Sequence, residues 1–562
     1  MACNTCRGNA NLVDLSQMDY EKSNCTIGNN ICKSCDEIND VEQDIAQTVK
    51  HLRNLLLRHQ DLKTEANHVH SPIMDLLPVE IISKIFETCL ERVDDEQDGS
   101  FTFTSLLHSE VGAPRMKLGA ICRTWRQIAW SSPQLWKEVI LVRCSPSERP
   151  DQYHMLDEWI SRSKDLPLDL YLCEYADDVT EDEYGQATWH TCLDLLAQCA
   201  NRWRTMDVYL QMPSFEYLSK QIQDSPPVQS IILRRDQRYH IDIPENYCLF
   251  HNHKLSPRSV SISGFFLQEI AINWEGVTNV YGENMSAEDC VELLKQAPQL
   301  QKCRFNSIHA IDVEDAPTTP LILRHQSLKY LSFASRDLCV QLFNKISLPG
   351  LTYFKCNLSP HDPLPDDPSL LPFFRRSSFS LTHLELTTGA LTSGYLISIL
   401  NTVPTLIHLR LDVSTYANEE DESVKPGPFL HYLAITAEPT GSVSFLPRLE
   451  SLEYELYSQF PWTHVPDIFG QPSYFGTPNR RPLKSFVVQS DSLHHKIPRD
   501  VLLRIKELRD TGFIIKFEIL GYDRIPLALE YHIKSEERAL RVPESYCYSG
   551  FLDVHIISQE LR

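Results

Sequence analysis

The stretch Leu381-Thr-His-Leu-Glu-Leu386 decides the fold, because its pattern returns in Leu406-Ile-His-Leu-Arg-Leu411. Both segments read apolar-x-x-apolar-x-apolar, and the alternation within each predicts a β-strand with one buried face. A proline stands two residues before several such segments, as in Pro404-Thr-Leu406. Helical patterns separate some of them, for example in residues 391–400. The pattern therefore predicts strands that alternate with helices or loops.

Similar apolar alternations recur from about residue 165 to residue 520. The predicted strands are 168–172, 206–210, 229–233, 258–262, 300–305, 328–333, 351–356, 381–386, 406–411, 430–435, 449–454 and 483–488. A single α/β domain is the alternative, but its strands would not share one internal pattern. The sequence thus predicts an α/β chain whose main part, residues 165–520, is an irregular leucine-rich-repeat solenoid.

Polar side chains alternate with the leucines of these predicted strands. In a solenoid they line the concave strand face, which is the face expected to bind another protein. The candidate residues for this target-binding surface are Lys329, Ser332, Lys355, Glu385, His408 and Arg410.

Residues 36–70 carry a heptad pattern, with apolar residues at alternating steps of three and four. The seam is Ile38, Val41, Ile45, Thr48, Leu52, Leu55, His59, Leu62, Ala66 and Val69, with Thr48 and His59 as its weak positions. This pattern predicts a long amphipathic, coiled-coil-like helix. Its partner is either a second copy, giving a homodimer through residues 36–70, or another part of this chain.

Residues 71–140 contain two short motifs at helical spacing. The first is Leu77-Pro-Val-Glu80-Ile81-Ile-Ser-Lys-Ile85-Phe86, in which Pro78 suits a first helical turn. The second is Ile121-Cys122-Arg-Thr-Trp125-Arg, on a helix expected from about residue 117 to residue 131, and Leu135-Trp136 follows it. These motifs predict a small helical module ahead of the solenoid.

The two motifs together resemble the F-box, and the arrangement of leader, helix, module and solenoid resembles F-box-like proteins abundant in mushroom-forming fungi. The resemblance implies three packed helices that bind the adaptor of an SCF-type cullin–RING ubiquitin ligase. The positions it carries over are Leu77, Pro78, Glu80, Ile81, Ile85, Phe86, Ile121, Cys122, Trp125, Leu135 and Trp136. These apolar residues can alternatively form the module's own core. The gap over residues 87–117 is longer than the family's usual gap, which puts adaptor binding in doubt.

The leader, residues 1–35, holds two Cys-x-x-Cys pairs, Cys3 with Cys6 and Cys32 with Cys35. Four thiolates in two such pairs satisfy a tetrahedral zinc ion, which would staple a segment that lacks a core. The alternative is a disordered tail with free thiols. Many of the 17 cysteines lie in apolar segments, and we expect them to be reduced thiols of an intracellular protein.

The charge of the chain argues against nucleic acid and anionic membranes as partners. The formal net charge is −22, and no run of lysine and arginine exceeds a few residues. No stretch of 18 apolar residues offers a membrane span, and the start lacks the apolar run of a secretory signal. We therefore expect a cytoplasmic or nuclear protein. Residues 521–562 suggest no role.

The sequence predicts no enzyme, because phosphate-loop, dinucleotide, nucleophile-elbow and His-Glu-x-x-His motifs are all absent. The expected function is a substrate-receptor subunit of a ubiquitin ligase, in which the F-box-like module holds the adaptor and the solenoid holds a target protein. The alternative is a non-catalytic interaction scaffold without ligase association. No cofactor is expected beyond the zinc left open for the leader.

Overall fold

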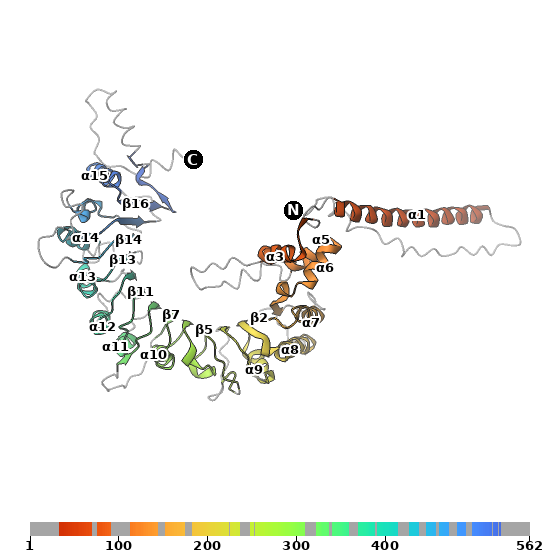
Figure 1. Ribbon diagram of the computed structural model, residues 1–562, viewed down its shortest axis with the longest axis horizontal. Helices are drawn as coiled ribbons and strands as arrows, with labels where there is room; N and C mark the ends of the chain where they lie inside the picture. Colours follow the sequence, from red (N-terminus) through yellow and green to blue (C-terminus); the bar gives the residue numbers. More distant parts are fainter. Residues whose placement is uncertain are drawn as a thin grey trace, which may run out of the picture. The chain divides into compact units, whose positions relative to one another are not determined.

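A computed structural model describes fifteen stretches of the chain. They are residues 33–69, 76–90, 113–143, 152–174, 183–235, 248–309, 322–335, 340–358, 369–387, 391–413, 426–437, 445–456, 460–470, 480–490 and 497–529, without residues 224, 252, 520 and 527. The described residues up to Leu135 form one compact unit, and those from Trp136 onward form a second (Figure 1).

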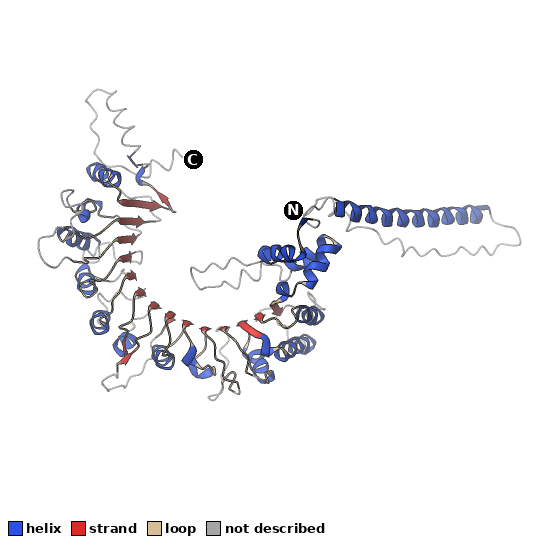
Figure 2. Cartoon of the chain, viewed as in Figure 1, coloured by secondary structure: helices blue, strands red, loops and turns tan. Residues whose placement is uncertain are grey.

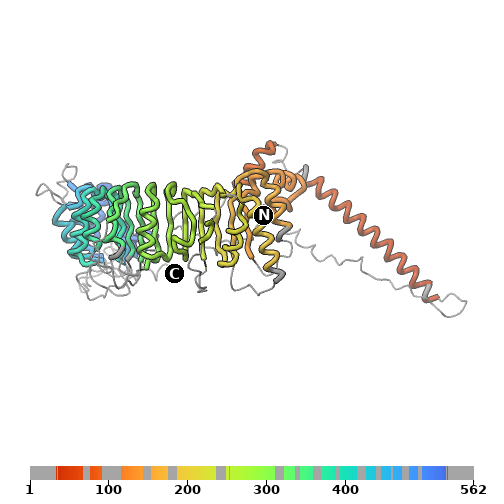
Figure 3. The backbone as a smooth tube through the Cα atoms, turned by 90° about the horizontal axis from the view of Figure 1, so that it is seen from below, coloured from red at the N-terminus to blue at the C-terminus, as the bar shows by residue number. Residues whose placement is uncertain are grey.

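The second unit is a curved solenoid built on one long sheet. Fifteen described strands follow chain order in this sheet, and every neighbouring pair is parallel except the last, β16 with β17. The strands line the inner side of the arc and the helices its outer side (Figure 2), while successive turns of backbone stack side by side (Figure 3). The predicted α/β solenoid is confirmed in this architecture.

The strands of the long sheet are β1 (Glu138–Arg143), β2 (Leu168–Glu174), β3 (Trp203–Tyr209), β4 (Ser230–Arg234), β5 (Ser259–Ser263), β6 (Asn279–Glu283), β7 (Lys302–Ile308), β9 (Tyr330–Ser335), β11 (Tyr353–Leu358), β12 (His383–Thr387), β13 (His408–Asp412), β14 (Ser451–Glu455), β15 (Ser485–Gln489), β16 (Ile514–Ile519) and β17 (Tyr522–Asp523). A separate pair consists of β8 (Leu323–Arg324) and β10 (Ile346–Ser347).

The helices of the solenoid are α7 (Gln152–Arg162), α8 (Glu183–Gln198), α9 (Met212–Gln221), α10 (Ala287–Gln296), α11 (Val340–Lys345), α12 (Leu370–Ser377), α13 (Ser393–Leu400), α14 (Pro426–Ile435) and α15 (Arg499–Asp510). Short 3-10 turns complete it: η4 (Ala200–Arg202), η5 (Leu267–Glu269), η6 (Trp274–Gly276), η7 (Trp462–His464) and η8 (Asp467–Phe469). A further 3-10 turn, η3 (Pro133–Trp136), contains the last residues of the first unit and the first residue of the solenoid unit.

The leucine pattern supplies the solenoid core. In the turns of β9, β11, β12, β13, β14 and β15, all three apolar positions of the motif are at most 2% exposed. Backbone bonds repeat from turn to turn, as when the Thr382 N–H donates to Thr352 O and the Ile407 N–H donates to Thr382 O. Gly350 is required at its turn, because a Cβ there would lie 2.1 Å from the Gln326 carbonyl oxygen. The repeated motif therefore sets both the burial and the register.

One predicted strand is wrong: residues 430–435 belong to helix α14. Phe429, Leu430 and Leu433 are its buried residues at helical spacing, whereas Ile435 is 57% exposed. The Arg481 guanidinium donates to Leu433 O at 2.9 Å and to Phe445 O at 2.8 Å, and so satisfies a carbonyl near the helix end. A distant arginine thus favours the helix over the strand.

The sequence prediction missed six of the described strands, β1, β6, β8, β10, β16 and β17, and began the solenoid too late. Strand β1 buries four consecutive apolar residues, Val139–Val142, and therefore shows no alternation. In β6 the inward position is Gly282, where the Met285 side chain fills the space that a Cβ would take. Strand β16 begins with the exposed Ile514, so its alternation starts one residue late.

The first unit contains α1 (Lys33–Val69) and a group of three helices, α3 (Val79–Leu90), α5 (Ala113–Ile121) and α6 (Arg123–Ser131). The single helix expected over residues 117–131 is therefore two helices. Cys122 interrupts it with an extended backbone, φ −156° and ψ 171°, and is the N-cap of α6. Within the described ranges, no helix has both the length and the apolar character needed to cross a membrane.

Candidate protein-interaction surfaces

Helix α3 packs against α6 through an aromatic and aliphatic core. The rings of Phe86 and Trp125 lie 4.7 Å apart, and Ile82, Ile128 and Ala129 are buried with them. The hydroxyls of Ser83 and Ser132 share a hydrogen bond of 2.8 Å across the two elements. The core of this unit is thus small and depends on a few large side chains.

The corner between α5 and α6 explains the Cys-Arg-x-Trp-Arg motif. The Cys122 thiol accepts a hydrogen bond from the Trp125 N–H at 3.4 Å, as an N-cap does. The Arg126 guanidinium donates to Gly119 O at 2.8 Å and lies over the Trp130 ring. Cysteine and arginine therefore fix the turn that brings Trp125 onto α3.

The predicted adaptor-binding residues divide into three groups by exposure. Phe86, Leu135 and Trp136 are buried, and Leu77, Cys122 and Trp125 are half-buried. The exposed group contains Pro78, Glu80, Ile81, Ile85 and Ile121, in which the three isoleucines are 49%, 42% and 55% exposed. Pro78 directly precedes α3, and its carbonyl oxygen accepts hydrogen bonds from the Ile81 and Ile82 N–H groups in the first turn.

Trp136 lies in the solenoid unit and is fully buried there. Its ring meets Trp159 edge-on at 5.3 Å, and the Arg162 guanidinium lies 4.9 Å from the Trp136 ring centroid. Both contacts come from α7, so Trp136 is part of the first turn of the solenoid. It offers no surface to a partner, and the same holds for Leu135, which is 3% exposed.

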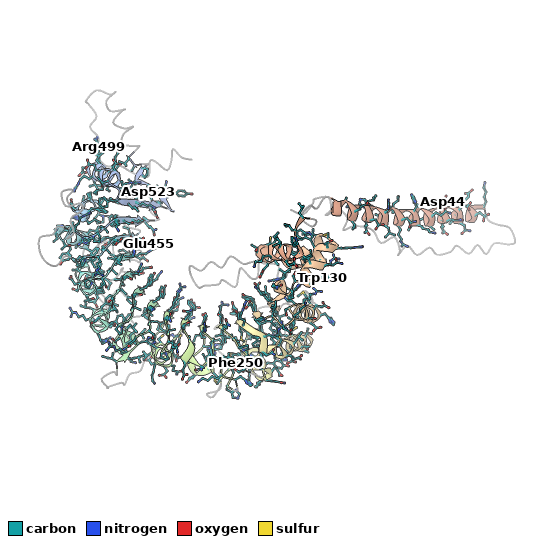
Figure 4. All side chains as sticks on the ribbon, viewed as in Figure 1. Asp44, Trp130, Phe250, Glu455, Arg499 and Asp523 are labelled. Atoms are coloured by element: carbon teal, nitrogen blue, oxygen red, sulfur yellow. The ribbon has the colours of Figure 1, made fainter. Side chains whose placement is uncertain are left out.

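Sequence reasoning missed several exposed apolar side chains on the three-helix group. They are Leu76 at 77%, Val79 at 53%, Met116 at 39% and Trp130 at 41% exposure. Trp130 is labelled in Figure 4. Their spacing gave no signal, because a helix in a small unit has several apolar positions and only packing decides which are buried.

The strand face of the solenoid arranges polar side chains in rows. Ser332, Lys355, Glu385 and Arg410 occupy one row, since each pairs in register with the next along β9, β11, β12 and β13. His408 lies in the neighbouring row, and Lys329 directly precedes β9. The structure therefore brings the six predicted surface residues onto adjacent strands.

Four rings stack along the row of His408. The centroids of Tyr330 and Tyr353 are 4.4 Å apart, those of Tyr353 and His383 are 5.7 Å apart, and those of His383 and His408 are 4.4 Å apart. Parallel strands lie about 4.8 Å apart, so one ring per strand at the same register stacks naturally. Burial, and then the neighbouring His408, lower the pKa of His383. We call these four residues the ring ladder.

Ion pairs bridge the strands beside the ring ladder. Lys355 Nζ lies 3.3 Å from Glu385 Oε2, and the Tyr353 hydroxyl donates to the Glu385 carboxylate. Burial, followed by this bond, raises the pKa of Tyr353. Arg410 pairs with Glu455 at 2.7 Å, and Figure 4 labels Glu455 on the inner side of the arc. These contacts hold side chains in fixed positions on the face.

The predicted zinc ligands are not among the residues whose side chains the structure describes, since these exclude Cys3, Cys6, Cys32 and Cys35. Within the described residues, no group of three metal-ligating side chains occurs. The described cysteines are free, and burial raises the pKa of the Cys192 thiol to about 11. Such thiols are packing residues rather than nucleophiles.

The seam of α1 is exposed along its described part. Ile38, Val41, Ile45, Leu52, Leu55 and Leu62 are between 39% and 57% exposed. An apolar stripe of this length in water is typical of a helix that pairs with another one.

Comparison with known proteins does not assign the chain to a protein family. No family model matches the chain, and no curated protein matches it. Among solved structures, the chain is similar to a chain in the crystal structure of the Rad7 and Elc1 complex in yeast, with a TM-score of 0.32 and 14% sequence identity. The similarity covers 74% of this chain and 92% of that chain. A likeness of this degree carries no argument about function.

Proposed function

We propose that the chain is a substrate-receptor subunit of an SCF-type cullin–RING ubiquitin ligase. In this proposal, the three-helix group binds the ligase adaptor and the strand face of the solenoid binds a target protein. The chain performs no bond chemistry. It speeds ubiquitin transfer because a tethered target lysine stays at high effective concentration near the charged conjugating enzyme.

The observation that carries the proposal is the exposure of Ile81, Ile85 and Ile121 on a very small helical unit. Ile81 and Ile85 lie one helical turn apart on α3, so they point in nearly the same direction. Three exposed isoleucines are unfavourable in a free unit, and burying them against a partner would stabilise it. They coincide with positions that the F-box resemblance assigns to adaptor binding.

The test is capture of a cullin-ligase adaptor by the full-length chain after co-expression. We expect the wild type to capture it, and Ile81→Glu/Ile85→Glu and Leu77→Ala/Pro78→Ala to lose it. The matched control is Ile435→Glu/Leu503→Glu, which places the same charges at exposed apolar positions of α14 and α15. Failure of the wild type to capture any adaptor would contradict the proposal.

A second candidate is a dimeric interaction scaffold without ligase association, favoured by the exposed seam of α1. In that case α1 joins two copies and the solenoids bind partners. Adaptor capture separates the two functions, since a scaffold captures none.

A further inference from the structure

The middle of the solenoid presents a positive surface in a chain whose net charge is −22. Strands β7, β9 and β11 contain Lys302, Arg304 and Lys355 and no acidic residue. Lys329 adds a fourth positive charge directly before β9. We call these four residues together with the ring ladder the central strand face.

The ring ladder adds to this positive character. Its faces are covered by stacking, and Lys302 and Arg304 lie over Tyr330 at 5.2 Å and 5.6 Å from the centroid. The ring edges therefore remain as the accessible part of the ladder, and an aromatic edge carries partial positive charge. The C–H edges of Tyr330 and Tyr353 thus carry the same sign as the neighbouring cations.

The arginines on strands β3, β4 and β13 are already neutralised. Arg204 pairs with Asp169, Arg234 pairs with Asp207 at 2.7 Å, and Arg410 pairs with Glu455. By contrast, Lys302, Arg304 and Lys329 form no ion pair with any described carboxylate. Unneutralised positive charge is therefore concentrated on β7 and at the start of β9.

We propose that the central strand face binds an extended acidic segment of the target protein. The inference rests on the proposed receptor function and names the chemistry of its target. From β7 to β13 the face crosses four strand spacings, about 19 Å, which an extended chain covers with about six residues. Aspartate and glutamate side chains of that segment pair with Lys302, Arg304 and Lys329, while Lys355 stays paired with Glu385 and the backbone of the segment lies along the ring edges.

A positive surface is also typical of nucleic-acid binding, but the ring ladder disfavours that ligand. Single strands bind by stacking bases on open aromatic faces. Here the ring faces already stack on one another. The face therefore offers charge without a platform for bases.

The experiment measures binding of three fluorescent probes to the full-length chain by anisotropy: hexaglutamate, hexaglutamine and oligothymidine. We expect hexaglutamate to bind in preference to hexaglutamine and to dissociate as salt rises. The double change Lys302→Glu/Lys329→Glu should weaken hexaglutamate binding by at least roughly tenfold, because two positive side chains that attract the probe become negative ones that repel it. Lys302→Gln/Lys329→Gln should weaken it less while leaving the fold least disturbed.

The matched control is Lys220→Glu/Lys295→Glu, which reverses two exposed lysines on α9 and α10. Equal weakening by this control would show a non-specific charge effect and overturn the inference. So would equal binding of hexaglutamate and hexaglutamine, or oligothymidine binding as tight as hexaglutamate. Adaptor capture is measured with the same variants to distinguish the two proposals. A chain that captures the adaptor but does not prefer hexaglutamate would support the proposed function and contradict the acidic-segment inference.

Discussion

His383 and His408 stack face to face on neighbouring parallel strands, with ring centroids 4.4 Å apart and planes 19° apart. The Thr382 hydroxyl shares a 3.0 Å hydrogen bond with His383 Nδ1, and Glu385, Lys355 and Arg410 lie in the adjacent row. Burial, and then the neighbouring His408, lower the pKa of His383 and so oppose its protonation. The stack is therefore a place where acid weakens the solenoid.

The first prediction concerns this pH dependence. The pKa of His383 is lower in the folded chain than in the unfolded chain, so the unfolded state binds more protons in the window between them. Neutral His383 therefore makes its full contribution to the free energy of unfolding above about pH 6.5, the usual histidine pKa. This contribution is lost as the pH falls through the lowered pKa of His383 in the folded chain. His383→Tyr keeps the stack and should reduce the loss of thermal stability on acidification, whereas His251→Gln, at an exposed site, should not.

The second prediction concerns Arg481, which is 2% exposed and donates to carbonyl oxygens around the end of α14. Burial lowers the pKa of this guanidinium to about 10. Arg481→Leu removes the donors and leaves buried carbonyls unsatisfied, which should cost about 3 kcal/mol of unfolding free energy. Denaturant titration checks it, with Arg448→Leu at an exposed position as the control. Equal losses in the two variants would contradict the role given to Arg481.

The sequence allowed most of the solenoid to be predicted, because its leucine motif combines strand alternation with a turn. Prediction failed where the residues that decide the structure are far apart. Residues 430–435 carry the same pattern as a strand, yet Arg481, which satisfies the end of α14, lies 46 residues beyond Ile435 in the chain. No local pattern contains that contact.

For the same reason, some residues of the candidate surfaces were predictable from the sequence and others were not. Lys355, Glu385 and Arg410 were predictable because strand alternation assigns each residue to a face. The ring ladder was not, since Tyr330, Tyr353 and His383 are neighbours only through register across three strands. On the three-helix group, the motif predicts Ile85 and Phe86 alike as adaptor-binding residues and does not show that Phe86 is buried and Ile85 exposed.

The third prediction uses that contrast between adjacent residues. Phe86 is 1% exposed and contacts Trp125, so Phe86→Ala should cost about 3 to 5 kcal/mol and unfold the three-helix group. Ile85→Ala, at a 42% exposed position, should change stability by less than about 1 kcal/mol and weaken only adaptor capture. Limited proteolysis between residues 76 and 135 reports the difference. Protection of the Phe86→Ala chain equal to wild type would contradict it.

The fourth prediction concerns the direction in which two copies of α1 pair, if the seam joins copies as the scaffold function requires. In a parallel pair, the flanking positions place Glu37 opposite Glu42 of the second copy and Arg58 opposite Lys63. Both contacts repel. In an antiparallel pair, Glu42 faces Lys63 and attracts it, and the repulsive flanking pair is reduced to Asp44 with Glu65.

The antiparallel register also accounts for the two weak seam positions. When Leu52 meets Leu55 of the second copy, the other layers pair Val41 with Ala66, Ile45 with Leu62 and Thr48 with His59. The two polar residues then share a layer, where the threonine hydroxyl and the imidazole can hydrogen-bond instead of facing apolar neighbours. An antiparallel register shifted by one heptad pairs both of them with apolar residues instead, for example Thr48 with Leu52 and His59 with Val41.

This arrangement is measurable in the full-length chain. Light scattering should give twice the monomer mass of 64.7 kDa, and Leu52→Glu/Leu55→Glu should restore the monomer, while Leu57→Glu on the outer side of the helix should not. Oxidation of a Thr48→Cys/His59→Cys chain, with isotope-mixed copies, should yield the 48–59 cross-linked peptide between copies. A 41–41 cross-link from Val41→Cys requires a parallel pair and contradicts the register, and a monomeric wild type contradicts pairing altogether. Antiparallel pairing places the C-terminal ends of the two α1 helices at opposite ends of a coil about 55 Å long.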